Sequence, residues 1–85
     1  MTQDEIRSVL LEEIGNIAPE VDLSILRPDA DLREELDIDS ISFLNLIIAL
    51  GRRLGVNVPE KDYSRLGTLN SAVDYLTRLT ASDRR

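Results

Sequence analysis

Residues 40–54 are the most strongly patterned segment of this chain and constrain its fold more than any other. Asp39 precedes the segment as a helix N-cap, and Gly55 follows it as a natural helix end. A single buried stripe needs only part of the apolar side chains in the segment. The residues that can form this stripe are Phe43, Leu46, Ile47, Leu50 and Leu54. The segment therefore predicts a helix that contributes one face to a small hydrophobic core.

Three other apolar residues of this helix lie on a second track: Ile41, Leu44 and Ile48. They follow one another at spacings of three and four, which places them along one line of the helix. Exposed aliphatic side chains on one line indicate a docking surface. A central helix that is buried on nearly all sides would show the same pattern, and the sequence leaves both interpretations open.

A second amphipathic helix is predicted near the start of the chain. Thr2 and Glu5 fit a capping box, in which each side chain binds the other residue's backbone N–H. The apolar residues that repeat at helical spacing are Ile6, Val9, Leu10 and Ile14. Gly15 is a natural stop, so we expect the helix to end there.

The last part of the chain predicts one short and one longer helix. Pro59 can open a short helical turn that reaches Tyr63, and Thr68 can cap the final helix. The apolar face of the final helix consists of Leu69, Ala72, Val73, Leu76 and Leu79. The polar residues 80–85 are expected to form a flexible tail.

The connection between residues 16 and 39 does not show a helical period. Pro19 and Pro28 argue against a long helix. Aliphatic residues that can hold this connection on the core are Ile17, Val21, Leu23, Leu26 and Leu32. Because no segment pairs convincingly as strands, the sequence predicts an all-α fold, a small bundle of three main helices and one short helix with a long first loop.

The composition excludes most catalytic chemistry. The 85 residues include no Cys and no His, which removes disulfides, thiolate or imidazole metal sites, cysteine nucleophiles and histidine bases. A net charge of -6 predicts repulsion from nucleic acid and attraction to basic protein surfaces. No apolar run approaches the roughly 20 residues that span a bilayer, and no signal peptide is visible. We expect a cytoplasmic, monomeric, non-enzymatic domain that covers residues 1–85.

The acidic segment before residue 40 does not fit a calcium loop. If the loop began at Asp29, Arg33 would stand where an oxygen ligand is needed, and Glu34 would replace the turn glycine. Ser40 would occupy the last position, where a bidentate Glu is required. We therefore expect no metal site.

Asp39 and Ser40 stand where this acidic segment gives way to the helix. A serine in this position is exposed and lies at the positive end of the helix dipole, where it can carry a phosphate group. The simpler interpretation is that Ser40 is an unmodified hydroxyl at a helix start. Ser42, in the same turn, is an equally ordinary hydroxyl. The local pattern leaves both open.

The longer stretch around this serine resembles the phosphopantetheine attachment region of the acyl carrier proteins. The resemblance includes residues 36–41, Leu-Asp-Ile-Asp-Ser-Ile, and continues through the following helix to residues 55–59, Gly-Val-Asn-Val-Pro. Its further matches are Tyr63, Thr68 and residues 72–76. The Asp-Ser pair alone is weak evidence, whereas the whole spacing is specific.

The resemblance implies a four-helix bundle of the acyl-carrier type. It implies that Ser40 takes 4'-phosphopantetheine from coenzyme A and that Asp39 helps the phosphopantetheinyl transferase to engage this serine. Acyl groups would be held as thioesters on the arm and presented to enzymes of fatty acid, polyketide or related specialised synthesis. These acyl-loading and acyl-using partners would have basic or apolar docking surfaces. The residues that we assign to partner binding are Ile41, Leu44, Ile48, Asp37, Asn45 and Arg52.

The chain departs from the family's usual pattern in two ways that bear on function. Asp37 stands where many members have Gly, and the helix over residues 40–54 lacks the acids that fatty-acid-synthesis carriers usually have there. The residues found at such places are Asn45, Gly51, Arg52 and Arg53. Partners that read an acidic helix should bind this chain poorly, which favours a specialised, free-standing carrier.

Two alternatives remain open at the level of the sequence. The chain can be an aminoacyl, D-alanyl or peptidyl carrier, because these share the fold and the attachment serine. It can also be a small acidic helical interaction module in which Ser40 is unmodified and only begins a helix.

Overall fold

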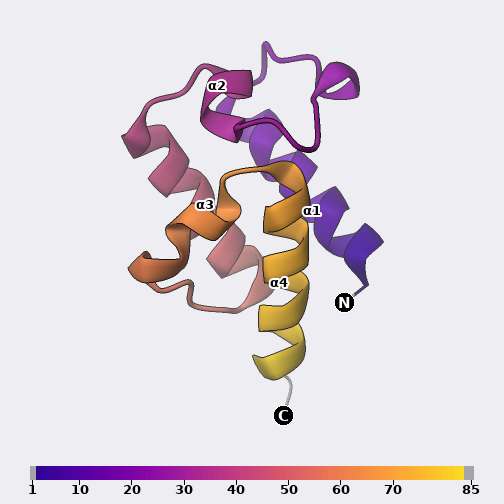
Figure 1. The fold of residues 1–85 in the computed structure, drawn as a ribbon, viewed down its shortest axis with the longest axis vertical. Helices are drawn as coiled ribbons and strands as arrows, with labels where there is room; N and C mark the ends of the chain where they lie inside the picture. Colours follow the sequence, from indigo (N-terminus) through magenta and orange to yellow (C-terminus); the bar gives the residue numbers. More distant parts are fainter. Residues whose placement is uncertain (1, 84–85) are drawn as a thin grey trace.

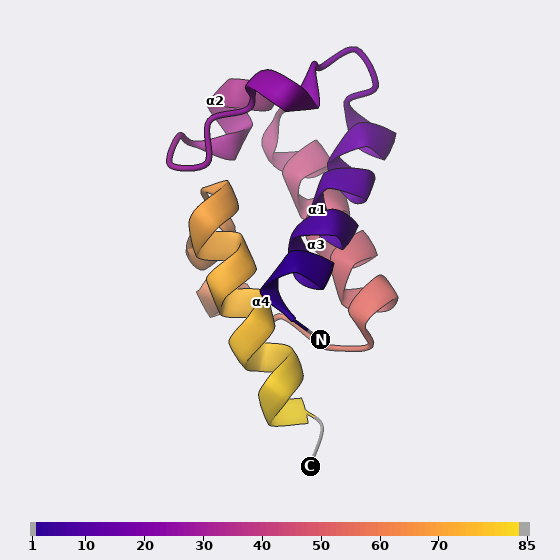
Figure 2. The same cartoon turned by 90° about the vertical axis from the view of Figure 1, so that its right-hand side faces the viewer.

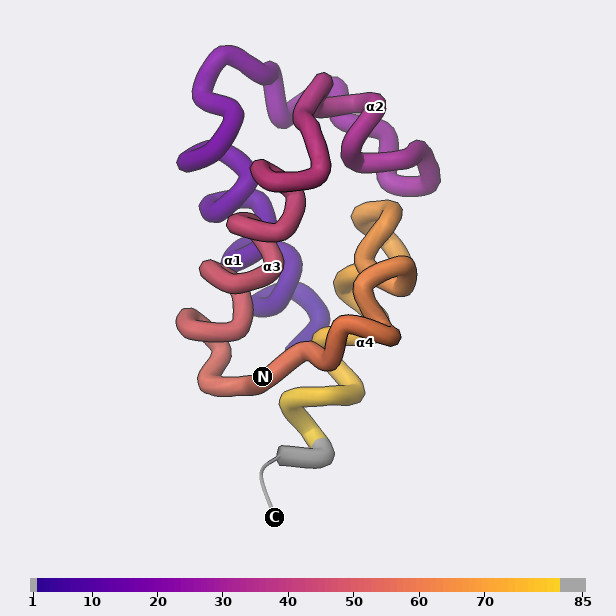
Figure 3. The backbone as a smooth tube through the Cα atoms, turned by 90° about the vertical axis from the view of Figure 1, so that its left-hand side faces the viewer, coloured from indigo at the N-terminus to yellow at the C-terminus, as the bar shows by residue number. Residues whose placement is uncertain are grey.

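The computed structural model describes residues 2–83, which form four α-helices and two 3₁₀ helices (Figure 1). In chain order these are α1 (Gln3–Ile17), η1 (Leu23–Ile25), α2 (Leu32–Leu36), α3 (Ser40–Leu54), η2 (Glu60–Leu66) and α4 (Leu69–Asp83). α1 packs against both α3 and α4, and η2 packs against α4. Views from two sides show α2 and the loop before it lying across one end of the longer helices (Figures 2 and 3). The predicted all-α bundle is confirmed.

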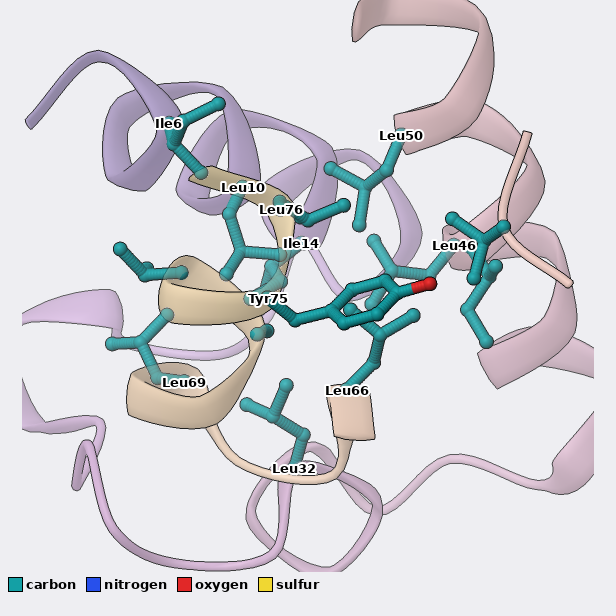
Figure 4. Close-up of a cluster of buried hydrophobic side chains, with 14 of the residues drawn as sticks. Ile6, Leu10, Ile14, Leu32, Leu46, Leu50, Leu66, Leu69, Tyr75 and Leu76 are labelled. Atoms are coloured by element: carbon teal, nitrogen blue, oxygen red, sulfur yellow. The ribbon is translucent and has the colours of Figure 1, made fainter. Parts of the chain in front are cut away.

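The side chains that converge between the helices form one aliphatic core (Figure 4). Ile6, Leu10 and Ile14 of α1 are fully buried. They lie beside Leu76 of α4 and opposite Leu50 of α3. Burying each such side chain contributes about 1.5–3 kcal/mol, which a domain without disulfides needs.

α1 begins as predicted but ends later. Thr2 Oγ1 accepts a hydrogen bond from Glu5 N at 3.2 Å, and Glu5 Oε1 accepts one from Thr2 N at 2.7 Å, so the capping box is confirmed. The predicted end at Gly15 is wrong, because the helix continues to Ile17. Ala18 follows as a buried cap residue whose N–H donates to Ile14 O at 2.9 Å. Burial of Ile14 and Ala18 on either side outweighs the weak helix propensity of one glycine.

α3 has the bounds that the sequence predicted. Asp39 caps its first turn, and Gly55 ends it in the left-handed conformation with φ 69°. Leu46, Ile47 and Leu50 are buried, so the predicted core stripe is confirmed at its centre. Phe43 and Leu54, at the ends of the stripe, are partly buried against the same core.

Gly51 has a structural reason to be a glycine. A Cβ atom at this position would lie 2.9 Å from the carbonyl oxygen of Val56, which is closer than van der Waals contact allows. The N–H of Val56 donates to Gly51 O at 3.0 Å, so the chain folds back tightly against the last turn of α3. The absence of an acid at position 51 is therefore a matter of packing.

The long first connection contains a helix that the sequence analysis missed. Asp31 caps α2 by accepting a hydrogen bond from Arg33 N at 2.9 Å, and Leu32 and Leu36 are buried one turn apart. Leu32 N also donates to Gly67 O at 2.7 Å. Five residues are too few to show a helical period, so only the cap and the Leu spacing of four could have indicated this helix.

The rest of that connection lies on the core as predicted. The aliphatic residues that pack there partly buried are Ile17, Val21, Leu23 and Leu26. Residues 23–25 form the 3₁₀ helix η1, which Asp22 caps through the N–H of Ser24 at 3.0 Å. The sequence analysis had predicted no regular structure at this place.

The predicted helical turn after Pro59 is present as η2, but it continues past Tyr63 to Leu66. It is held to α4 by the Tyr75 hydroxyl, which donates to Asp62 Oδ2 at 2.7 Å. Burial, together with this hydrogen bond to Asp62, raises the pKa of Tyr75 to about 12. The phenol is therefore neutral and able to donate at any physiological pH.

α4 begins after Thr68, as predicted, and Thr68 Oγ1 accepts a hydrogen bond from Ser71 N at 3.1 Å. The helix continues beyond Leu79 to Asp83, into the segment predicted to be a flexible tail. Thr80 is buried, and its hydroxyl donates to Leu76 O at 2.9 Å. Residues 84–85, the end of the predicted tail, lie outside the described residues.

Candidate functional site at the start of α3

Ser40 is the first residue of α3 and is exposed to solvent. Asp39, the residue before it, accepts a hydrogen bond from Ser42 N at 2.8 Å through its Oδ1 atom. The backbone N–H of Ser42, and after it the Ser42 hydroxyl, lower the pKa of the Asp39 carboxyl. The site therefore presents an accessible hydroxyl beside a fixed, ionised carboxylate at the positive end of a helix.

Arg33 reaches the same serine from α2. Its Nη2 atom donates a hydrogen bond to Ser40 Oγ at 2.8 Å, and both side chains are exposed. Among the residues that the structure describes, Arg33 forms no ion pair with a carboxylate. The sequence analysis treated Arg33 only as a residue that spoils a calcium loop. The contact depends on the tight reversal between α2 and α3, which has no periodic signal.

Asp37 forms that reversal. It has φ 52° and ψ 49°, the left-handed conformation, and its N–H donates to Arg33 O and Glu34 O. A residue in this conformation closes α2 and directs the chain into α3. Glycine adopts this conformation without steric cost, whereas a residue with a side chain does not.

The Asp37→Gly substitution is expected to raise the free energy of unfolding by about 1 kcal/mol, because it removes the steric cost of a left-handed residue with a side chain. Urea unfolding followed by circular dichroism measures the change. Asp37→Asn is the matched control, since Asn tolerates this conformation but has no charge, and it should stay close to the original protein. A less stable Asp37→Gly protein would contradict this account.

A cleft of about 510 Å³ lies beside the serine, between α3, α2 and η2. Phe43, Leu44 and Tyr63 contribute apolar surface to it, and Arg33 and Ser40 also line it. A chain attached to Ser40 can therefore lie along apolar side chains without leaving the protein surface. The sequence analysis did not place Phe43 or Tyr63 in such a cleft, because the two come from elements that only the tertiary fold brings together.

The second apolar track of α3 is exposed. Ile41 is 70 % exposed, Leu44 38 % and Ile48 43 %. The interpretation of α3 as a helix buried on nearly all sides is therefore wrong. Asn45 and Arg52 are also exposed on this helix, and Asp37 is exposed just before it. All of the residues assigned to partner binding are therefore exposed, on α3 or just before it.

The two arginines at the end of α3 have different surroundings. Arg53 donates to Glu13 Oε2 at 2.9 Å and to Glu12 Oε1 at 2.6 Å, so it ties α3 to α1. Arg52 forms no ion pair within the described part of the chain, and it borders a second cleft of about 320 Å³ together with Ile48. Of these two arginines, Arg52 is therefore the one that offers an uncompensated positive charge near the apolar track.

The helices described within residues 2–83 are all too short or too polar to cross a membrane.

Comparison with known proteins finds a phosphopantetheine attachment domain over most of the chain. Residues 4–76 match the family described as "Phosphopantetheine attachment site". An acyl carrier protein of Acidothermus cellulolyticus is 30 % identical over 82 residues, which cover 96 % of this chain and 96 % of that protein. An acyl carrier protein of Rubrobacter xylanophilus is 33 % identical over 73 residues, which cover 82 % of this chain and 90 % of that protein.

The fold is also that of a solved structure. An acyl carrier protein from Enterococcus faecalis superimposes with a TM-score of 0.78 over 93 % of this chain and 99 % of the other. The two sequences are 23 % identical, so this likeness concerns the fold alone.

Proposed function

Because this chain belongs to the acyl carrier protein family, we propose that Ser40 is the residue to which its 4'-phosphopantetheine arm is attached. Members of this family are carriers without catalytic activity, and 4'-phosphopantetheine is their prosthetic group. The arm supplies the thiol that carries the acyl thioester, which a chain without Cys cannot supply itself. The observation that carries the proposal is the exposed Ser40 hydroxyl directly after the N-cap of α3.

The surroundings of Ser40 fit this group. A phosphodiester on the hydroxyl adds negative charge next to Asp37 and Asp39. The positive end of α3 and the Arg33 guanidinium, 2.8 Å from Ser40 Oγ, offset that charge. The apolar cleft beside Ser40 gives the rest of the arm and its acyl group a surface to lie on.

Asp39 is proposed to have two roles. Its carboxylate caps α3 through the Ser42 N–H, and its pKa is lowered by that contact, so it stays ionised where the transferase binds. An ionised carboxylate next to the reacting hydroxyl is what a transferase with a bound magnesium ion can recognise. The cap holds the carboxylate at 2.8 Å from Ser42 N, and the side chain stays exposed where a partner can reach it.

Partner enzymes are proposed to dock on the exposed side of α3. The docking surface consists of Ile41, Leu44, Ile48, Asp37, Asn45 and Arg52. A phosphopantetheinyl transferase and the enzymes that load and use the acyl group all have to approach Ser40, where this surface begins. Apolar contacts, with a polar rim that includes Arg52, supply affinity and orientation.

We assign the carrier to fatty acid, polyketide or related specialised synthesis, with partners that do not depend on an acidic α3. No Asp or Glu occurs between Ser40 and Leu54, and Arg52 carries the free charge on this helix. The phosphopantetheine family match favours a carrier over an unmodified interaction module. An aminoacyl, D-alanyl or peptidyl cargo is the alternative, and loading assays with adenylating enzymes would distinguish it. The cytoplasmic location and monomeric state stay predictions.

Co-expression with a phosphopantetheinyl transferase is expected to raise the intact mass of the protein by about 340 Da, the mass of the arm, through one covalent modification. Intact-mass spectrometry measures the gain, and fragmentation of the modified peptide locates it on Ser40. An unchanged mass with several transferases, or a gain located on another residue, would contradict the proposal.

A further inference from the structure

We propose that Arg33 binds the phosphodiester of the loaded carrier and thereby fastens α2 to the start of α3. This inference rests on the attachment of the arm at Ser40. Arg33 would then be a phosphate-binding residue of this chain rather than part of the surface that partners recognise.

The geometry places the guanidinium where the phosphate must be. Arg33 Nη2 lies 2.8 Å from Ser40 Oγ, the atom that becomes the ester oxygen. The phosphorus bonds directly to this ester oxygen, and the non-bridging oxygens bond to the phosphorus. They therefore lie only two bonds away from Ser40 Oγ. A planar guanidinium can bind two such oxygens side by side, which makes arginine well suited to phosphate groups.

The charges around Arg33 also favour binding of the phosphodiester. In the described part of the chain, Arg33 has no carboxylate in ion-pair contact, and its side chain donates to the neutral Ser40 hydroxyl. Of the nearby acids, Asp31 and Asp39 already accept backbone N–H groups as helix caps. A cation without a counter-ion gains more from an attached anion than from the hydroxyl that it contacts in the unmodified protein.

The consequence for the fold follows from the size of α2. This helix has five residues and is joined to α3 by residues 37–39. An ion pair across that joint holds α2 against α3 more firmly than the hydroxyl contact does. Loading is therefore expected to stabilise the domain, and Arg33 is expected to be the residue through which it does so.

The test compares the unmodified and the phosphopantetheinylated protein by thermal unfolding at low salt. The modified protein is expected to melt about 4 °C higher, within the range that one additional charged contact gives in a domain of this size. In Arg33→Gln the difference should nearly vanish, and in Arg33→Lys it should return in part. Arg78→Gln is the matched control, because it removes one arginine charge from α4 outside the cleft and should keep the full difference.

One measurement on the original sequence does not depend on a variant. The melting difference should shrink in about 1 M salt, where the screening length falls to about 3 Å. The ³¹P resonance of the phosphodiester should also shift between the original protein and Arg33→Gln. If Arg33→Gln cannot be loaded, the salt series decides.

The two proposals fail in different ways. A chain that gains no mass with the transferase overturns both of them. A loaded protein that shows the same melting difference at low and at high salt, or the same difference in Arg33→Gln, overturns the role of Arg33 alone.

Discussion

Replacing Ser40 with alanine is expected to abolish the mass gain of about 340 Da completely, because the ester oxygen of the modification is lost. Ser42→Ala, in the same turn of α3, should keep the full gain. The measurement is intact-mass spectrometry after co-expression of each variant with the same transferase. The effect is all or none and does not depend on how tightly any partner binds.

The Ser40→Ala protein should still fold, so the loss of modification can be assigned to the hydroxyl. Ser40 is exposed, and its hydroxyl accepts a hydrogen bond from Arg33 that the fold does not depend on. Asp39 still caps α3 through the N–H of Ser42, and alanine is a good helix former. Circular dichroism checks the fold. A gain that persists in Ser40→Ala, or that is lost in Ser42→Ala, would move the attachment to another serine.

The Leu46→Ala substitution is expected to lower the free energy of unfolding by about 3 kcal/mol, because it removes a fully buried side chain and leaves a cavity. Leu46 is 1 % exposed and lies in the core beside Leu50 (Figure 4). A loss of this size is a large fraction of the stability of an 85-residue domain. Urea unfolding measures it, with the slope of the transition as a check on two-state behaviour.

Leu44→Ala is the matched control on the same helix. Leu44 belongs to the outer track and is 38 % exposed, so the same change of residue type should cost less than about 1 kcal/mol. The contrast between the two leucines tests the division of α3 into a core stripe and a docking surface. Equal losses would show that the outer track is also needed for the fold, and the docking interpretation would lose its basis.

The predictions from the sequence were best where the signal is local. The bounds of α3, its cap Asp39, its end Gly55 and the capping box of α1 all depend on residues within one helical turn of each other. α2 was missed because five residues are too few to show a helical period. The end of α1 was misplaced because the burial of Ala18 beyond the glycine is a tertiary contact. The resemblance that pointed to Ser40 depended on the spacing between its motifs along the chain, and this spacing can be read directly from the sequence.

The contacts that surround the site could not be predicted in the same way. Arg33 meets Ser40 only because Asp37 adopts a left-handed conformation and reverses the chain. Arg53 is engaged by Glu13 across 40 positions of sequence, so its charge is committed to holding α3 on α1. Neither contact produces a periodic pattern in the sequence from which it could be predicted.

The sequence by itself determined that the chain is all-helical and that Ser40 stands at the start of a helix, because caps, periods and motif spacing are short-range properties. Only the tertiary structure decided whether the second apolar track of α3 is exposed, which of Arg52 and Arg53 has no ion pair in the described part of the chain, and which cation stands beside the serine. The physical reason is that burial and charge pairing depend on which elements pack together. Leu44 and Leu46 are the same residue type two positions apart, and their exposure differs because of what surrounds them.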